Sequence, residues 1–593
     1  MSVNLASLDD WDIVVDAAAI PSEVYAAQEF CDHFERASNV SLPIVTSTER
    51  PDRHIFIGES PPMRQSRVGF EPAKMGDEDL RIVVRDRNIA IAGGRPRGTL
   101  YGVYTFLEDH LGVRFLTHDH THVPPVGEWR AIGPIDQSYH PPLGFRWPFY
   151  GETNRNENFA ARLRCNTVTR DQKLGGITST ILINHTFDHL VPTATYGRTH
   201  PEYYCLIDGK RRGDVEDPFG GKGNEPCLTN PDVLRIVTQS TLDEIKRHPE
   251  CANVSVTQND NDLNCRCEDC ARLDDREGTP MGSLLTFVNA VADEVAAKHP
   301  DVKVGTLAYW YSRKAPRTIK PQDNVMIQLA SIECSMFQPI NDPDSKLNTD
   351  FCGDLEQWSR ICSDISIWNY NTNFHNYLLP CPNLRIIESN IRFFVAHNAR
   401  GIFMQAAGDA LGAEFSDLRN YVMARLLWNP NLSGERLIDE FVSLHYASAA
   451  PPIRRYIDLV HDTVASNGIE KNCFASAAEH GIDPSVVKAG LKAFDEAARL
   501  ADNADVRRRV EKASVCAYRA AIEDAWVWAK AHEEKLPGAA MPKRIAKRTR
   551  PHARRLFELC EAHGVTHWHE GYPLAEARDL LRKAYGLSED ESF

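Results

Sequence analysis

Three acidic residues that follow short hydrophobic stretches are the first candidates for acid–base chemistry. Asp260 follows NVSVTQN, Glu333 follows NVMIQLASI, and Glu414 follows GIFMQAAGDALGA. Cleavage of a glycosidic bond needs two carboxyl groups with separated pKa values, one as acid and the other as base or nucleophile. The sequence predicts Asp260 as the acid and Glu333 as the base or nucleophile, with Glu414 binding a hydroxyl or replacing one of them. The alternative for each is a helix cap or a loop ion pair.

Aromatic and polar residues accompany these carboxylates at the ends of the hydrophobic stretches. Aromatic faces stack on the C–H surfaces of sugar rings, while amides and other polar groups bind sugar hydroxyls. The sequence therefore predicts a carbohydrate-binding cleft, although histidines and tryptophans at such positions also occur as core residues. The predicted substrate-binding residues are Arg146, Trp147, His185, Asn259, Trp310, Trp368, Tyr370, Asn373 and His375.

A cysteine cluster follows the Asp260 loop. Cys265, Cys267 and Cys270 have the spacing C-x-C-x-x-C, and such short separations let thiolates converge on one tetrahedral ion. The fourth ligand is predicted to be Cys227 or Cys205. We expect a structural zinc ion here and no cofactor for catalysis. The alternative is a group of free or partly disulfide-bonded cysteines.

Elements that would position these residues alternate between strand and helix over residues 143–430. Eight strand-like stretches alternate with helical stretches, which predicts a (β/α)8 TIM-type barrel with its active site at the carboxyl ends of the strands. A doubly wound open sheet is the competing architecture, but no G-x-G-x-x-G or P-loop follows a strand. The predicted strands are LGFRWPFY, TSTILINHTF, EYYCLI, NVSVTQND, KVGTLAYWY, NVMIQLAS, DISIWNY and GIFMQAA.

Two further domains flank the predicted barrel. Residues 1–122 are predicted to form a small α/β domain, and the proline-rich residues 123–142 are predicted to form a linker. From residue 431 to 593 amphipathic helical patterns predict an all-helical domain. At 593 residues the chain is long enough for three or four domains.

Composition and charge exclude several classes of partner. The net charge of −15 argues against nucleic acid and against an anionic membrane surface, and no apolar stretch is long enough to cross a membrane. The N-terminus has no pattern of a secretory signal, and the 15 cysteines form no disulfide framework, so a cytoplasmic protein is expected. A secreted or periplasmic location is the alternative if a leader has been trimmed.

At several stretches the chain resembles bacterial proteins that carry the domain DUF4838, part of which is placed in glycoside hydrolase family 163 with endo-β-N-acetylglucosaminidase activity on N-glycans. The first of these stretches also resembles the N-terminal domain of family 67 α-glucuronidases, whose barrel is followed by a helical domain. The matching stretches are RGTLYGVYTFLEDHLGVRF, THPEYYCLIDGKRRG, EPCLTNPDV, VSVTQNDNDLNCRCEDC, ISIWNYNTNFHNYLLPCPNL and GAEFSDLRNYVMARLLWNP.

The resemblance implies a barrel that acts on a glycan. In family 67 the acid follows strand four and the base candidates follow strands six and seven, so Asp260 and Glu333 occupy comparable places. The end of the seventh strand here, from Asn369 to His375, carries no carboxylate, which departs from the α-glucuronidase pattern.

Three functions are compatible with the sequence. The first is a glycoside hydrolase that cleaves an oligosaccharide or glycan by carboxylate catalysis. The second is a hydrolase or lyase directed at uronic acids, in which Arg146 and His185 would hold the sugar carboxylate. The third is a glycan-binding protein that has kept the fold and lost the chemistry.

Overall fold

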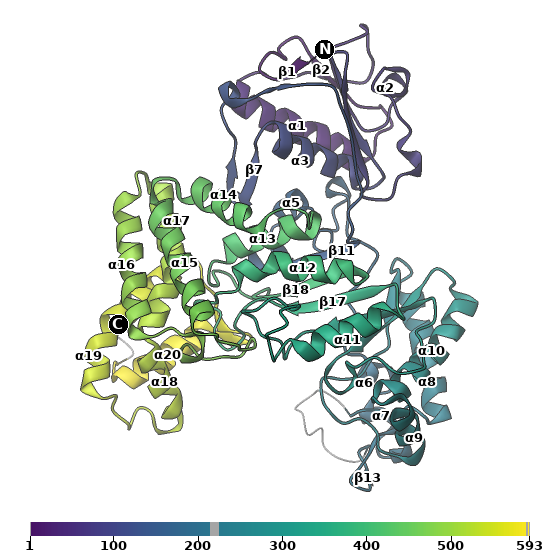
Figure 1. Ribbon diagram of the computed structural model, residues 1–593, viewed down its shortest axis with the longest axis vertical. Helices are drawn as coiled ribbons and strands as arrows, with labels where there is room; N and C mark the ends of the chain where they lie inside the picture. The colour runs from purple at the N-terminus through teal and green to yellow at the C-terminus, as the bar shows by residue number, and fades with distance from the viewer. Residues whose placement is uncertain (1, 214–223, 589–590, 592) are drawn as a thin grey trace.

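The computed structural model describes residues 2–213, 224–588, 591 and 593. Its N-terminal part is a six-stranded sheet covered by two helices (Figure 1). Helices α1 (Pro21–Ser38) and α3 (Gly98–His110) bury their apolar residues against the sheet, as their periodicity predicts. In the order of pairing, the strands are β10 (Ile135–Tyr139), β5 (Leu80–Arg85), β6 (Asn88–Gly93), β4 (His54–Ile57), β2 (Asp12–Val14) and β3 (Ile44–Val45).

The stretch predicted as a linker, residues 123–142, belongs to this part of the fold. β9 (Ala131–Ile132) pairs with β1 (Val3–Asn4), and β10 pairs with β5 along its whole length. The prolines indicated a linker, but they lie before and after these strands, where no backbone N–H is needed, so they do not prevent strand pairing.

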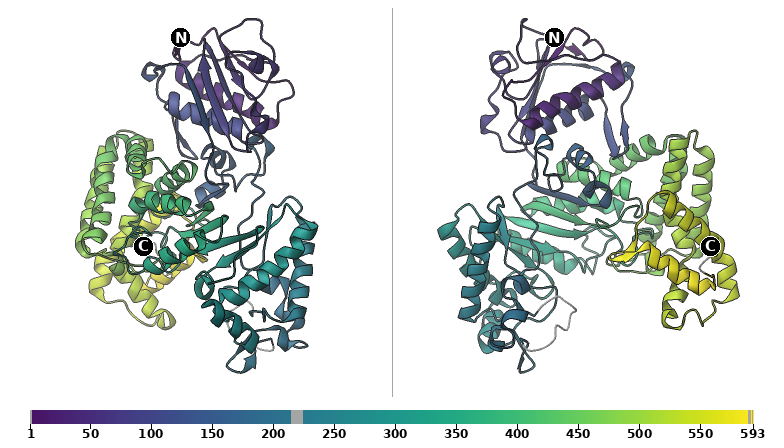
Figure 2. Two further views of the ribbon diagram at one scale, coloured as in Figure 1. Left: turned by 45° about the vertical axis from the view of Figure 1, so that its right-hand side comes forward. Right: turned by 180° about the vertical axis from the view of Figure 1, so that it is seen from behind.

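A second six-stranded sheet forms the centre of the molecule, and all of its strands run parallel. The sheet curls as in a TIM-like barrel (Figures 1 and 2). The helices beside it are α8 (Pro231–Arg247), α10 (Met281–Lys298), α11 (Thr349–Ser359), α12 (Ile387–Ala396) and α13 (Ser416–Trp428). In the order of pairing, the strands are β11 (Phe145–Phe149), β18 (Ala399–Gln405), β17 (Ile365–Tyr370), β16 (Val325–Ala330), β15 (Lys303–Ala308) and β14 (Asn253–Ser255).

Two of the eight predicted strands are not part of this sheet. The stretch TSTILINHTF runs beside β14 but is held largely by side chains, since Asn253 Oδ1 and Ser255 Oγ accept from the backbone N–H groups of Ile181 and Asn184. The stretch EYYCLI leads into a short hairpin, β12 (Leu206–Ile207) with β13 (Lys210–Arg211). Hydrophobic runs of this length predict buried backbone but not its pairing partner.

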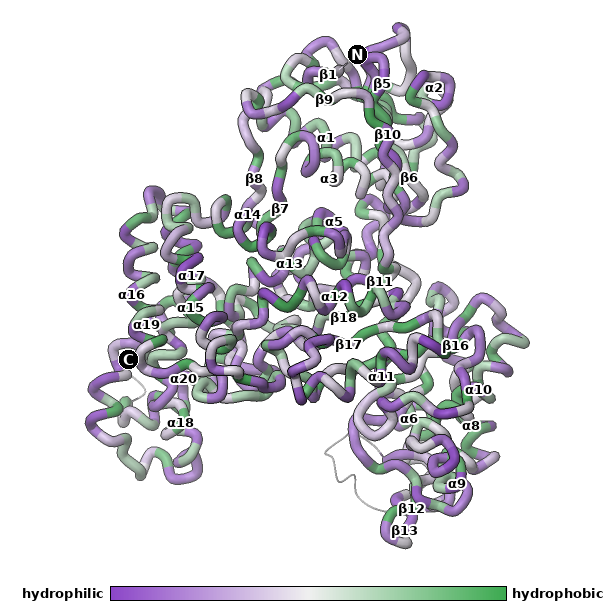
Figure 3. The backbone as a smooth tube through the Cα atoms, viewed as in Figure 1, coloured by the Kyte–Doolittle hydropathy of each residue, from purple (hydrophilic) through white to green (hydrophobic). Residues whose placement is uncertain are grey.

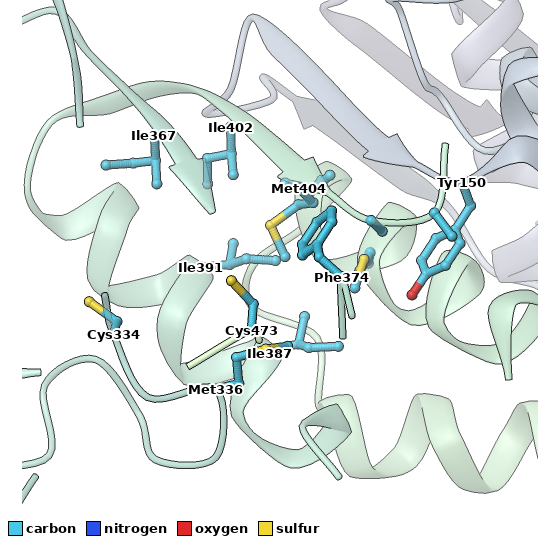
Figure 4. Close-up of a cluster of buried hydrophobic side chains, with 14 of the residues drawn as sticks. Tyr150, Cys334, Met336, Ile367, Phe374, Ile387, Ile391, Ile402, Met404 and Cys473 are labelled. Atoms are coloured by element: carbon cyan, nitrogen blue, oxygen red, sulfur yellow. The ribbon is translucent and has the colours of Figure 1, made fainter. Parts of the chain in front are cut away.

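The two faces of the central sheet have separate apolar cores. Side chains such as Ile367, Ile402 and Met404 point toward the surrounding helices, where they meet Ile387 and Ile391 of α12 (Figure 4). The inner face forms a smaller cluster of Ile183, Leu307, Tyr309, Met326 and Ala330. This alternation leaves the inner side chains near the strand ends available to line a cleft.

The C-terminal part is mostly helical, and hydrophilic and hydrophobic segments alternate along its helices (Figure 3). One departure from the all-helical prediction is the hairpin of β19 (His567–His569) and β20 (Tyr572–Pro573), which reaches back to the central sheet (Figure 2). No described helix is long and apolar enough to cross a membrane. The helices are α14 (Gly434–Tyr446), α15 (Ala450–Ser466), α16 (Pro484–Leu500), α17 (Ala504–Ala521), α18 (Glu523–Ala531), α19 (Lys543–Ala562) and α20 (Leu574–Tyr585).

A buried carboxylate joins the N-terminal part to the central sheet. Glu78 lies between two buried arginines, with Oε2 2.6 Å from Arg146 Nη1 and Oε1 2.8 Å from Arg97 Nε. Burial alone would raise the pKa of Glu78, but the two guanidinium groups outweigh it and lower the pKa. Arg146 is therefore a structural residue: it is 1% exposed and does not reach a sugar-binding surface, contrary to the sequence prediction.

We expect Glu78→Ala to lower the free energy of unfolding by about 3–5 kcal/mol, because it leaves two buried guanidinium groups without their counter-charge. Asp77→Ala is the matched control, since Asp77 is exposed and lies 3.7 Å from Arg97, and its effect should be about 0–1 kcal/mol. Urea unfolding measures both. The stabilisation by Glu78 should be complete above its ordinary pKa of 4.5 and should be lost progressively as the pH falls from there through the lowered folded-state pKa. Equal effects of the two variants would contradict this account.

Candidate active site

An open cleft of about 410 Å³ lies at the carboxyl ends of β15, β16, β17 and β18. This is the edge of the sheet at which barrel enzymes carry out their chemistry. The cleft combines aromatic faces with two carboxyl groups and one imidazole. It is lined by His185, Asp260, Leu307, Tyr309, Trp310, Ala330, Ile332, Trp368, Tyr370, Phe374, Gln405, Phe474 and Glu570.

Tyr309 and Trp310 form the aromatic wall at the end of β15. Their rings stack with centroids 5.0 Å apart and planes 17° from parallel, and Trp310 is 41% exposed. Trp310 also has a φ of 49°, a left-handed conformation that is costly for a bulky side chain. A large apolar ring held exposed at this cost is typical of a surface that binds a ligand.

Asp260 is held in the cleft by its loop and by Tyr309. The Tyr309 hydroxyl donates to Asp260 Oδ1 at 3.2 Å. Two residues earlier, Gln258 Nε2 donates to the carbonyl oxygen of Tyr309 and to Ser312 Oγ, which fixes the start of the loop. His185 lies beside the same loop, with Nδ1 2.6 Å from the carbonyl oxygen of Gln258 and its ring packed near Tyr309.

Glu570 enters the cleft from the C-terminal hairpin and was not predicted from the sequence. Gln405 Nε2 donates to Glu570 Oε1 at 3.4 Å, and Trp368 Nε1 donates to Gln405 Oε1 at 2.6 Å. Partial removal from water raises the pKa of Glu570, and the carboxylates of Asp409 and Asp260 raise it further, while the hydrogen bond from Gln405 opposes them. The stretch HWHEGY, polar and aromatic around a glycine turn, was the available signal in the sequence.

Glu333 and Glu414 do not line the cleft. Glu333 Oε2 accepts from Arg313 Nη1 at 2.8 Å, and Arg313 also binds Asp354. Glu414 is buried away from the cleft, where its Oε2 lies 2.6 Å from Arg419 Nη2. Burial raises the pKa of Glu414, and Arg419 offsets only part of that rise.

Several predicted substrate-binding residues have structural roles instead. Asn259 and Asn373 are buried: Asn259 Oδ1 accepts from the N–H of Asp188 in a neighbouring segment, and Asn373 Oδ1 accepts from the N–H of His375 in its own loop. Trp147 packs against Phe149 and Phe403 deeper in the sheet. His375 is exposed beside Phe474 at the margin of the cleft. Trp310, Trp368, Tyr370 and His185 do line it.

Four cysteines, three of them buried and Cys267 partly buried, lie close together next to the Asp260 loop. The Sγ atoms of Cys227, Cys265, Cys267 and Cys270 all lie within 4.8 Å of one another, and none of the four is in a disulfide. This separation fits the edges of a tetrahedron of thiolates around one metal ion. Cys205, the alternative fourth ligand, packs beside the group but does not belong to it.

Comparison with known proteins finds one matching family profile and solved structures of similar fold. The sequence profile described as "Domain of unknown function (DUF4838)" matches residues 115–458. The chain matches none of the curated proteins. A solved structure titled "A novel family GH115 4-O-Methyl-alpha-glucuronidase, BtGH115A, with specificity for decorated arabinogalactans" is similar at a TM-score of 0.60 and 10% identity, covering 98% of this chain and 80% of that chain.

Two further solved structures align over most of the chain with lower scores. A structure described as a "GH138 enzyme targeting pectin rhamnogalacturonan II" has a TM-score of 0.38 at 10% identity, covering 98% of this chain and 77% of that chain. "Structure of CpGH84D" has a TM-score of 0.43 at 10% identity, covering 99% of this chain and 96% of that chain. At such identity, the likeness to the GH115 structure shows a shared fold and nothing about the substrate.

We expect Glu414→Gln to lower the free energy of unfolding by about 3–5 kcal/mol, because it leaves the buried Arg419 without a counter-charge. Turnover per folded molecule should stay near that of the wild type, since Glu414 does not reach the cleft. Glu435→Gln on α14 is the control, because Glu435 forms an exposed ion pair with Arg454. Thermal melting measures the stability of both variants, and an assay normalised to the folded fraction measures their turnover. A stable Glu414→Gln protein without turnover would restore the catalytic role predicted from the sequence.

Proposed function

The chain belongs to the DUF4838 family, and from the geometry of its cleft we propose that it hydrolyses a glycosidic bond in an oligosaccharide or glycan. One observation carries the proposal: a carboxylate, Asp260, faces an aromatic-lined cleft at the carboxyl ends of parallel strands. Aromatic rings suit the apolar faces of sugars, and the carboxylate suits the charge that develops at an anomeric carbon. The fold shared with a glycoside hydrolase supports the same conclusion.

Asp260 is best suited to act as the base or nucleophile. The hydroxyl of Tyr309 donates to its carboxylate and thereby stabilises the charged form. This reverses the preference drawn from the sequence, in which Asp260 was the acid. Glu333, the earlier candidate for base, is bound to Arg313 beside the cleft, so we propose that it positions this wall rather than reacting.

The cleft favours a sugar without a negative charge. Among the described residues that line it there is no lysine or arginine, and His185 is the one basic side chain. Arg146, which would have held a uronic acid, is bound to Glu78 far from this surface. We therefore rank a uronic-acid-directed activity below hydrolysis of a neutral sugar, and a purely binding function below both.

We also propose that the four-cysteine cluster binds one structural zinc ion. Four thiolates complete a tetrahedral site and leave no open position for catalysis. Cys265, Cys267 and Cys270 follow the Asp260 loop, while Cys227 comes from the segment before α8. A bound ion would join these two segments and hold the loop in place.

Asp260→Asn should reduce turnover by a factor of at least about 100 on any glycan that the wild type cleaves, with little change in melting temperature. The substitution keeps the shape of the side chain and removes its charge. Asp262→Asn is the matched control, two residues further along the same loop and exposed, and it should leave turnover unchanged. The measurement is a kinetic comparison on a glycan panel. Near-normal turnover in Asp260→Asn would contradict the proposal.

Elemental analysis should find about one zinc ion per chain, and Cys267→Ser should lose most of it. The variant should melt at a lower temperature than the wild type, because metal binding contributes to folding. Cys251→Ser is the control, since Cys251 lies outside the cluster and should keep both zinc and melting temperature. A disulfide among the four cysteines, or metal-free protein of full stability, would refute the zinc site.

A further inference from the structure

We infer that Glu570, on the β19–β20 hairpin of the C-terminal part, is the group that protonates the leaving oxygen in the cleft. The inference rests on the proposed hydrolytic function and names the second carboxyl group that such a reaction requires. Glu570 lines the same cleft as Asp260, although 310 positions separate them in the sequence. It lies outside the predicted barrel and outside the residues matched by the family.

The hairpin is fixed to the rim of the central sheet on both sides of Glu570. Before it, Thr566 Oγ1 accepts from the N–H of Leu411 at 2.9 Å, and the Trp568 carbonyl accepts from the N–H of Tyr377 at 2.9 Å. After it, the N–H of Gly571 donates to Asp409 Oδ2 at 3.4 Å. Gly571 has a φ of 66°, so the turn that presents Glu570 needs a glycine at this position.

Gln405 determines which oxygen of Glu570 can carry a proton. The indole N–H of Trp368 can only donate, so the atom of Gln405 that it meets at 2.6 Å must be the amide oxygen. The NH2 group of Gln405 therefore faces Glu570 and donates to Oε1. Oε1 is thus an acceptor in either charge state, and Oε2 is the oxygen that holds the proton when Glu570 is neutral.

The surroundings of Glu570 favour the neutral form that a general acid needs. Partial desolvation and the carboxylates of Asp409 and Asp260 raise its pKa. Glu570 remains exposed in the structure, and a sugar bound in the cleft would remove further water and strengthen the same effect. Asp260 differs from Glu570 in its hydrogen-bond partner, because the hydroxyl of Tyr309 donates to its carboxylate. A glycosidase needs two carboxyl groups in different surroundings, one to donate a proton and one to act as base or nucleophile.

In the reaction, the proton on Glu570 Oε2 moves to the glycosidic oxygen as the bond between that oxygen and the anomeric carbon breaks. The bonding electron pair leaves with the oxygen, which departs as a hydroxyl. Asp260 meets the positive charge at the anomeric carbon, either by attack or by taking a proton from a water that attacks. Water supplies the second hydroxyl. Its remaining proton passes directly to Glu570 when Asp260 has attacked, and when Asp260 has acted as base it leaves Asp260 to solvent while Glu570 regains a proton from solvent, so no oxidant is required.

The test compares full-length wild type, Glu570→Gln and Glu576→Gln on matched methyl and 2,4-dinitrophenyl glycosides of neutral and N-acetylated hexoses. The dinitrophenolate group leaves without protonation, so Glu570→Gln should lose about 100-fold or more in kcat on methyl glycosides and at most about 10-fold on dinitrophenyl glycosides. Its pH profile on methyl glycosides should lose the alkaline limb. Glu576 is exposed on α20 just after the hairpin and is the control, which should match the wild type on both.

Asp409→Asn gives a second measurement in case Glu570→Gln folds poorly. Removing the charge of Asp409 should lower the pKa of Glu570, so the alkaline limb of the pH profile should move to lower pH. An unmoved limb, or equal losses by Glu570→Gln on both leaving groups, would overturn the assignment and leave Glu570 a structural residue. Full activity of Glu570→Gln with an inactive Asp260→Asn would refute Glu570 alone. A wild type that cleaves none of the probes would refute the hydrolytic function and this inference together.

Discussion

Parallel hydrogen bonding across the central sheet is the constraint on which the site depends. Because β11, β18, β17, β16, β15 and β14 all run in one direction, the segments that follow them emerge at the same edge. Side chains from separate strand ends, such as Asp260, Trp368 and Gln405, thereby line one cleft. The inner aliphatic side chains below them, such as Leu307 and Ala330, close the floor of the cleft. Everything polar in the cleft therefore lies on a rigid, largely apolar base.

Two anchors hold the Asp260 loop above this base. On one side Gln258 is fixed to Tyr309 and Ser312 at the end of β15. On the other side the chain enters the cysteine cluster only five residues after Asp260, and Cys265 Sγ also accepts from the backbone N–H of Leu206. A loop fixed at both ends can hold a carboxylate with little loss of entropy on substrate binding. The cluster thus contributes to the site although it lies outside the cleft.

Periodic features of the sequence predicted more of the structure than long-range ones did. Alternating strands and helices correctly indicated the parallel sheet, and C-x-C-x-x-C correctly indicated clustered thiols, because both signals are local. Pairing is not local: the stretch around Ile183 is as hydrophobic as a strand, yet side chains of β14 hold much of it. The role of Glu414 was equally hidden, since only the fold shows that Arg419 is buried against it. To predict that Glu570 lines the cleft, one would have to know where a distant hairpin packs.

The docking of that hairpin has a consequence for relationships between proteins of this family. The matched family segment ends at residue 458, so Phe474 and Glu570, which complete the wall of the cleft, come from chain beyond it. Two members could therefore share every strand of the sheet and still present different walls, because the family profile does not include the tail. Under the proposed function, membership of the family would speak for the strands that line the cleft, while the tail would decide whether a carboxyl group is present at the position of Glu570.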